Sequence, residues 1–448
     1  MVLKRDSSRL KKIDTWNLWH PFTQMQTYAE EGAPIIERGE GIFLFDTDGK
    51  KYYDSISSLW CNVHGHRHPR IDNAIKFQLE KIAHSTLLGL GSVSSLELTE
   101  RLVKLTGMPH VFYADSGSGA VEIALKVAYQ FSVRRKGKSC NKFVSFKNAY
   151  HGDTLGSVSV GGIDIFHSAF KPLLFETLFA PSPYAYRWPT ENCKEEALKK
   201  FEEILNSFEK EISAVVIEPM VQGAAGMILE PSGFLSEIRR MTAERDIILI
   251  CDEVATGFGR TGKMFAVDHE SVKPDVLVLG KGITGGYLPL SAACFTTEIF
   301  ESFLGRHEEM KHFFHGHTYT GNALASAAAI ASLEVFEEEK TLEKLSEKIK
   351  LIEDKFSKLR SRSNVGDIRQ CGMMAGIELV EEKATKKSFP LEKRMGHRVT
   401  IEARRRGMIT RPLGDTCVFM PPLSSSLDEL TAMLEILSES IEAAIGDN

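Results

Sequence analysis

The chain has 448 residues, of which 43% are hydrophobic and 26% charged, as is usual for a globular protein in water. Its net charge of −5 gives no reason to expect nucleic-acid binding, and no run approaches the roughly 20 apolar residues of a membrane span. The seven cysteines are scattered, with no two at metal-finger spacing, and the basic N-terminus has no apolar segment behind it to form a secretory signal. We therefore expect reduced thiols and a cytoplasmic protein.

Helical and strand patterns alternate along the middle of the chain. The first 70 residues carry short β-like runs such as 42–45, separated by turn signals. From about residue 71 the patterns predict helices over 71–83 and 95–106 and a third that begins near Ser118, with strands at 111–114, 143–146, 214–217, 247–251 and 276–279. This alternation predicts an α/β protein with a mostly parallel sheet.

The C-terminal part has a different pattern. After Gly321 the chain reads as helical to about residue 360, followed by one strand at 374–379 and helices near 393–406 and 428–444. We expect a large domain over residues 71–320. Residues 1–70 and 321–448 would together form a smaller α+β domain.

Two of the predicted strands end in residues that suit a pyridoxal phosphate site. The run 247–251 ends in Asp252, and the run 276–279 is followed by Gly280 and Lys281. A lysine can form a Schiff base with the cofactor aldehyde, while a carboxylate keeps the pyridine nitrogen protonated so that the ring accepts electrons. Taken singly, Asp252 could be a helix cap and Lys281 a surface lysine. Their joint occurrence at strand ends favours the cofactor site.

Two more motifs lie at the ends of predicted strands. Ser116, Gly117 and Ser118 stand between a strand and a helix start, where exposed amides and the helix dipole favour a phosphate. A serine-capped helix after a tight turn is the alternative. Tyr150, within a Tyr-His-Gly-Asp segment, could stack on a cofactor ring or could be a core tyrosine with a polar tip.

Arg411 and a histidine cluster are further candidates. The Arg411 guanidinium could bind a substrate carboxylate, although an arginine alone is more often part of a structural ion pair. The alternating His64, His66 and His68 suggest a metal, but no cysteine or acid accompanies them in that turn. We therefore expect no metal site.

Together these residues give a family resemblance. The chain resembles the class III aminotransferases, which have the pyridoxal phosphate fold type I, from about residue 19 to residue 437. Within that family it is similar to the branch that converts 8-amino-7-oxononanoate to 7,8-diaminononanoate in biotin biosynthesis. The segments that carry the resemblance are 19–23, 63–66, 115–118, 150–154, 252–262, 280–281 and 411–412.

The resemblance implies roles for the matching residues in a ping-pong transamination. Lys281 would hold pyridoxal 5'-phosphate and move the proton, Asp252 would pair with the pyridine nitrogen, and Tyr150 would stack on the ring. Backbone amides of Gly117 and Ser118 would bind the phosphate.

The resemblance also implies a homodimer and a substrate pocket. His317 and Thr318 match a phosphate loop that reaches across from the neighbouring subunit. Arg411 would bind the carboxylate of 8-amino-7-oxononanoate. The residues that would line its pocket or border the amino-donor pocket are Leu59, Trp60, Tyr150 and Gly316.

Three positions depart from relatives and bear on the amino donor. Ala224 stands where ornithine- and aminobutyrate-type members have a glutamate, which disfavours a glutamate/2-oxoglutarate couple. Members that use S-adenosylmethionine often have a tyrosine in place of Phe22 and a tryptophan in place of Leu59. A lysine-using branch carries phenylalanine and a smaller aliphatic residue there, and this chain resembles it more closely. The donor is thus S-adenosylmethionine or lysine.

Three other functions remain open on the same fold. The first is an ω-amino acid:pyruvate aminotransferase. The second is an aminomutase or decarboxylase, which would need no separate amino donor. The third is a protein that binds the cofactor without catalysis, against which the intact Asp252 and Lys281 argue.

Overall fold

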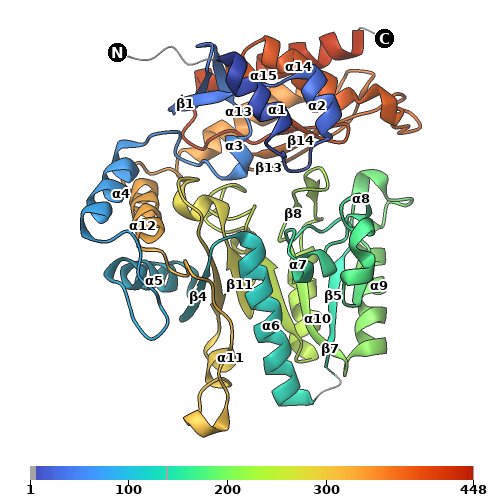
Figure 1. Ribbon diagram of the computed structural model, residues 1–448. Coiled ribbons are helices and arrows are strands. Elements are labelled where there is room, and N and C mark those ends of the chain that lie inside the picture. The colour runs from blue at the N-terminus through green and yellow to red at the C-terminus, as the bar shows by residue number, and fades with distance from the viewer. Residues whose placement is uncertain (1–6, 138–139, 447–448) are drawn as a thin grey trace.

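A seven-stranded sheet forms the centre of the lower part of the molecule in Figure 1, a computed structural model that describes residues 7–137 and 140–446. Lys4 and Arg5 of the basic N-terminus lie outside these ranges. The strand order is β4-β12-β11-β10-β7-β5-β6. Only the pairs that include β12 are antiparallel in this sheet. The strands are β4 (His110–Ala114), β5 (Lys142–Phe146), β6 (Thr177–Ala180), β7 (Ile212–Ile217), β10 (Ile248–Asp252), β11 (Val276–Leu279) and β12 (Ser291–Phe295). The predicted mostly parallel α/β sheet is confirmed.

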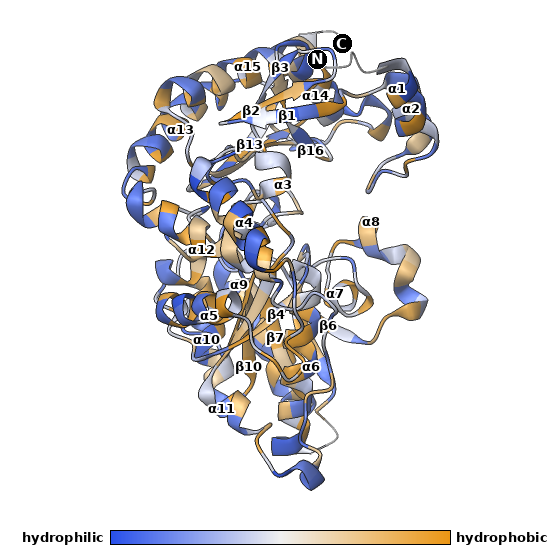
Figure 2. Cartoon of the chain, turned by 60° about the vertical axis from the view of Figure 1, so that its left-hand side comes forward, coloured by the Kyte–Doolittle hydropathy of each residue, from blue (hydrophilic) through white to orange (hydrophobic). Residues whose placement is uncertain are grey.

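Helices cover both faces of this sheet, which explains its continuous apolar strands. Alternate residues of a strand point to opposite faces. Ala214, Val216 and Ile250 pack with α6 (Gly117–Lys136) on one face. Val215 and Leu249 lie in the core that includes α9 (Cys193–Phe208) and α10 (Phe234–Glu244) on the other. Figure 2 shows mostly orange strands in the interior of this part and blue on the helices around it.

The upper part of Figure 1 brings the two ends of the chain together. One sheet has the order β1-β2-β3-β15, with β1 (Ile36–Glu40), β2 (Phe43–Asp46), β3 (Lys51–Asp54) and β15 (Met408–Ile409). A second has the order β13-β14-β17-β16, with β13 (Val365–Cys371), β14 (Met374–Leu379), β16 (Arg411–Leu413) and β17 (Thr416–Phe419). The pairing of β3 with β15 is consistent with a small domain built from both termini. Its limits at residues 70 and 320 stay predictions.

The remaining elements connect or cover these sheets. The longer helices are α1 (Ser7–Trp16), α2 (Met25–Glu31), α4 (Pro69–Lys81), α5 (Val93–Thr106), α12 (Ala323–Glu338), α13 (Leu345–Leu359), α14 (Met395–Arg405) and α15 (Leu427–Gly446). The short elements are α3 (Ser57–Trp60), α7 (Leu155–Ser159), α8 (Asp164–His167), α11 (Thr297–Glu301) and the hairpin β8 (Val221–Gln222) and β9 (Ile228–Leu229). In the described part of the chain, no helix has the length and apolar character needed to cross a membrane.

The structure contains strands that the sequence patterns did not predict. They include β6, β12, β13, β16 and β17. The β12 residues Ser291, Ala292 and Ala293 are small and lack the β-branched side chains typical of strands. Their pairing with β11 and β4 on either side, and not their intrinsic preference, makes them a strand.

Candidate active site

A cavity of about 460 Å³ opens where β5, β7, β10 and β11 end. The carboxyl ends of these parallel strands meet at one edge of the sheet, which is where ligands bind in open α/β folds. Six of the predicted site residues line the cavity: Trp60, Gly117, Ser118, Tyr150, Asp252 and Lys281. The structure therefore brings these six residues together around one cavity, while their roles stay predictions.

Lys281 stands just beyond β11 in a conformation unusual for a residue with a side chain. Its φ is 42°, in the left-handed region. Its Nζ lies 5.0 Å from the centre of the Trp60 ring, within cation–π range. Burial lowers the Lys281 pKa, while the nearby Asp252 and Glu218 act to raise it. The lowered pKa increases the fraction of neutral amine, the form that can act as nucleophile or base.

Asp252 ends β10 as a buried carboxylate with a partner for each oxygen. Its Oδ2 lies 2.8 Å from His151 Nδ1, and its Oδ1 accepts the backbone N–H of Val254 at 3.0 Å. Both side chains are almost fully buried, at 5% exposed for Asp252 and 0% for His151. This pairing compensates the burial of the charge and fixes the direction of the carboxylate.

The turn before α6 brings a helix N-terminus to the cavity. Ser116 caps the 20-residue helix, because its Oγ accepts the Gly119 N–H at 3.1 Å. A Cβ on Gly117 would lie 2.6 Å from Val254 Cγ1, so only glycine fits this approach. The capping interpretation and the phosphate interpretation are compatible here, since the cap orders amides that an anion can use.

Tyr150 is held at the cavity by its ring, its hydroxyl and its backbone. The hydroxyl donates to Asp153 Oδ2 at 2.6 Å, and the ring lies parallel to His167 with the centres 6.4 Å apart. Burial, chiefly, and Asp153 raise the Tyr150 pKa, so the phenol keeps its proton. The Tyr150 N–H donates to Glu218 Oε1 at 2.9 Å.

Trp60 and Leu59 belong to a short helix whose backbone is irregular. Trp60 has a φ of 65°, its side chain is 6% exposed, and its ring lines the cavity. Leu59 instead is 48% exposed and does not line this cavity. Its predicted place at the border of the donor pocket stays a prediction.

Arg411 lies beside the main cavity and not in its wall. It lines a neighbouring cavity of about 310 Å³ together with Phe22, whose ring centre is 5.8 Å from the guanidinium carbon. Burial lowers the Arg411 pKa, and Tyr150 is close enough to oppose that shift. Among the described residues, Tyr150 is the group that opposes the effect of burial on the Arg411 pKa, and no carboxylate contributes. The guanidinium is thus available for an external anion.

Gly316, His317 and Thr318 lie in an extended segment outside the main cavity. His317 Nδ1 is 3.6 Å from Asp115 Oδ2, and the Thr318 carbonyl oxygen is 2.8 Å from His84 Nε2. Gly316 and Thr318 are exposed in the single chain. The structure therefore brings His317 near the α6 turn, while the predicted role across a subunit boundary stays a prediction.

The histidines of the 64–68 turn each have a separate partner. His64 Nε2 bonds Ser332 Oγ at 3.0 Å, His66 Nε2 bonds Asp54 Oδ2 at 2.9 Å, and His68 Nε2 bonds Glu339 Oε1 at 2.9 Å. Burial, the largest cause, lowers the His64 pKa to about 3. These contacts give each ring a structural role.

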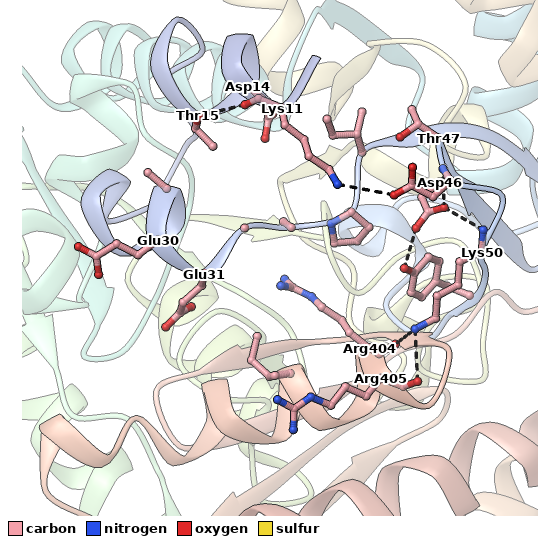
Figure 3. Close-up of a pocket in the computed structure, with 18 of the residues that line it drawn as sticks. Lys11, Asp14, Thr15, Glu30, Glu31, Asp46, Thr47, Lys50, Arg404 and Arg405 are labelled. Atoms are coloured by element: carbon pink, nitrogen blue, oxygen red, sulfur yellow. Dashed lines mark hydrogen bonds and ion pairs between the residues drawn. The ribbon is translucent and has the colours of Figure 1, made fainter. Parts of the chain in front are cut away.

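A larger cavity, of about 740 Å³, lies between α1, α2, the β2–β3 turn and α14 (Figure 3). Two of its lysines are already compensated by neighbours. Lys11 Nζ is 3.6 Å from Asp48 Oδ2, and Lys50 Nζ donates to the carbonyl oxygen of Arg404 at 2.9 Å. None of the candidate catalytic residues lines this cavity. Its size alone does not make it the active site.

The residues around the 460 Å³ cavity at the strand ends fit pyridoxal phosphate. An amine, a fixed buried carboxylate and a helix N-terminus surround one space, with the Tyr150 ring on its wall. These groups match an aldehyde, a ring nitrogen and a phosphate on one flat molecule.

Sequence reasoning assigned no role to two buried residues of this cavity, His151 and Glu218. Glu218 follows β7 as Asp252 ends β10, so the same signal, an acid at the end of an apolar run, was available for it.

Comparison with known proteins gives consistent results. A family model described as aminotransferase class-III matches residues 27–441. An adenosylmethionine-8-amino-7-oxononanoate aminotransferase from Aquifex aeolicus is 50% identical over 444 residues, covering 98% of both chains. The crystal structure of the enzyme of the same name from Methanocaldococcus jannaschii has a TM-score of 0.94 and 46% identity, covering 98% of this chain and 99% of that one. A PLP-bound amine transaminase from an uncultivated Pseudomonas species has a TM-score of 0.90 and 32% identity, covering 95% and 98%.

Proposed function

The chain belongs to the class III aminotransferase family, and from this we propose that it converts 8-amino-7-oxononanoate to 7,8-diaminononanoate in biotin biosynthesis. The observation that carries the proposal is the 50% identity, over 98% of both chains, to a relative named for this reaction. The cavity supports it, because Lys281 and Asp252 face one space at the carboxyl edge of the sheet.

The cofactor is pyridoxal phosphate, which supplies an aldehyde that captures amines and a ring that accepts electrons. Lys281 holds it through Nζ. Asp252, oriented by His151, stabilises a proton on the ring nitrogen through its carboxylate. The first amides of α6, at Gly117 and Ser118, bind the phosphate, and the helix dipole adds to the attraction.

Lys281 also moves the proton. With its Nζ free, the lowered pKa of Lys281 would leave the amine neutral enough to take a proton from the donor carbon. The Trp60 ring, 5.0 Å from Nζ, stabilises the ammonium that results. Tyr150 keeps its proton and acts by stacking.

Arg411 binds the carboxylate of the amino-acid-like substrate. The guanidinium has no carboxylate partner among the described residues and stands at the edge of the cavity beside Phe22. Trp60 and Tyr150 of the main cavity, and Gly316 in the dimer, would enclose the rest of the substrate, and Leu59 would border the donor pocket. Phe22 and Leu59 favour lysine as amino donor, with S-adenosylmethionine as the alternative.

The active form is a homodimer. Several large apolar side chains are exposed in the single chain, among them Trp16, Trp19, Leu88 and Phe314, and a partner subunit would cover them. In the dimer, His317 and Thr318 reach the phosphate of the neighbouring subunit. All seven cysteines are free thiols, which suits the cytoplasm.

Two half-reactions test the proposal. The cofactor-loaded protein is mixed separately with lysine and with S-adenosylmethionine, and absorbance follows the conversion of the cofactor from its aldehyde to its amine form. We expect one donor to react, and 8-amino-7-oxononanoate to restore the aldehyde form far better than pyruvate. Lys281→Ala should show neither change. A preference for pyruvate would contradict the proposal and favour an ω-amino acid:pyruvate aminotransferase, which the 32% identical amine transaminase makes the second candidate.

A further inference from the structure

Glu218 is a buried acid in the active-site wall for which the reaction described above has no use. It follows β7, is 4% exposed and lines the cavity together with Asp252 and Lys281. Burying a carboxylate is costly unless its oxygens find donors. Its donors therefore indicate what it does.

Both Glu218 oxygens accept backbone N–H groups, and these come from two separate segments. Oε1 accepts the Tyr150 N–H at 2.9 Å, and Oε2 accepts the Gly223 N–H at 3.0 Å. Tyr150 belongs to the segment after β5, and Gly223 follows β8 of the β8–β9 hairpin. One side chain thus ties two loops to the end of a central strand.

Each of these loops presents one wall of the cavity. Tyr150 presents the aromatic ring proposed to stack on the cofactor. Gly223 backs the Trp60 ring, since a Cβ at this position would lie 3.2 Å from Trp60 Cζ3. We propose that Glu218 is a positioning residue that sets the separation of the Tyr150 wall and the Trp60 wall through these two backbone hydrogen bonds.

The ionised form of Glu218 makes both bonds at full strength, because protonation turns one carboxylate oxygen into a hydroxyl, which is a weaker acceptor for a backbone N–H. The charged and titratable groups that face it are His151, Asp252, Lys281, Glu230 and Tyr150. Burial, chiefly, and Asp252 raise the Glu218 pKa to about 7, against His151 and the two N–H groups. Protonation below that pH should therefore weaken the hold on one of the two loops.

Hydrogen–deuterium exchange of the cofactor-loaded protein tests this without relying on turnover. Glu218→Gln keeps the size but replaces one acceptor by an NH2 group. We expect the Tyr150 or Gly223 amide to exchange at least about tenfold faster, as for loss of one hydrogen bond to a charged group. Glu230→Gln is the matched control: Glu230 is also buried, and its Oε2 accepts the Met220 N–H of the same hairpin at 3.0 Å. It should leave Tyr150 protected.

The pH dependence of amide exchange in the wild-type protein is a second test, and it does not depend on whether a variant folds. After correction for intrinsic rates, protection of these two amides should fall between pH 8 and pH 6. Unchanged protection of both amides in Glu218→Gln, or equal loss at Tyr150 in Glu230→Gln, would overturn the proposal, as would constant wild-type protection across that range.

Kinetics then connects positioning to the proposed function, on which this last step rests. With absorbance showing full cofactor loading, Glu218→Gln should lower kcat/KM about tenfold and flatten the acid limb of its pH profile. Unchanged kcat/KM in the loaded variant would contradict the inference. If the wild-type protein transfers no amino group, the proposed function fails, while the exchange result stands by itself.

Discussion

Gly117 stands where two loops of the active site approach closely, so adding one methyl group there should be costly. A Cβ on Gly117 would lie 2.6 Å from Val254 Cγ1 and 2.9 Å from Val254 Cγ2. Apolar carbons prefer separations of about 3.5–4.0 Å, so in Gly117→Ala the start of α6 or the Val254 segment must shift by roughly 1 Å. Overpacking of this kind costs roughly 1–3 kcal/mol. The free variant relaxes by this shift, but the phosphate needs the first amides of α6 in their unshifted position, so binding restores the clash and bears its cost. At about 1.4 kcal/mol per factor of ten, the affinity for pyridoxal phosphate should then fall roughly ten- to hundredfold.

The assay is a titration of the cofactor-free protein with pyridoxal phosphate, followed by absorbance. Val254→Ala removes the two methyl groups that clash, so the double variant Gly117→Ala with Val254→Ala should recover most of the lost affinity. Gly446→Ala is the control, because its added Cβ has no neighbour within 4 Å. Wild-type affinity in Gly117→Ala, or no recovery in the double variant, would refute the steric argument.

Three further predictions concern single side chains. Asp252→Asn should keep cofactor bound but slow the half-reaction severely in stopped-flow absorbance, since the ring nitrogen loses its anion; normal rates would remove Asp252 from its role. Arg411→Ala should raise KM for 8-amino-7-oxononanoate roughly ten- to hundredfold, as for loss of a charge-assisted hydrogen bond of about 1.5–3 kcal/mol. KM for the amino donor should change little. An equal rise in KM for both substrates would show that Arg411 has a structural role instead. Burial raises the Glu253 pKa from 4.5 to about 7, so from pH 4.5 to 7 only the unfolded chain releases this proton. As the pH rises through this range, the free energy of unfolding of the wild type, measured with urea, should therefore fall by up to about 1.4 kcal/mol per pH unit relative to that of Glu253→Gln. A difference between the two proteins that does not change with pH would contradict the pKa shift.

The buried sheet was predictable because its strands are continuous apolar runs with a polar residue at the end. Each of β7, β10 and β11 is followed or ended by a group that reaches the cavity, namely Glu218, Asp252 and Lys281. Parallel pairing places all such ends at one edge, so the residues at the ends of the apolar runs indicated where to look for the candidate site.

Other features depend on neighbours far along the chain and left no local signal. The partnership of Asp252 with His151 joins residues 101 positions apart, and the pattern of neither segment indicates it. The same holds for β12, whose small residues become a strand through pairing with β4 and β11. The position of Arg411 outside the main cavity depends on how the two terminal segments pack, which no spacing encodes.

The pairing of β3 with β15 has a consequence for biosynthesis. Ser55, just after β3, bonds the carbonyl oxygen of Ile409 at 2.9 Å, across 354 residues of chain. Ribosomes add about 5–20 residues per second, so the edge of β3 waits roughly 20–70 s for its partner. During that interval the nascent chain carries an open strand edge that can associate with other chains. Cells that make this protein thus have a defined period in which a chaperone would be most useful.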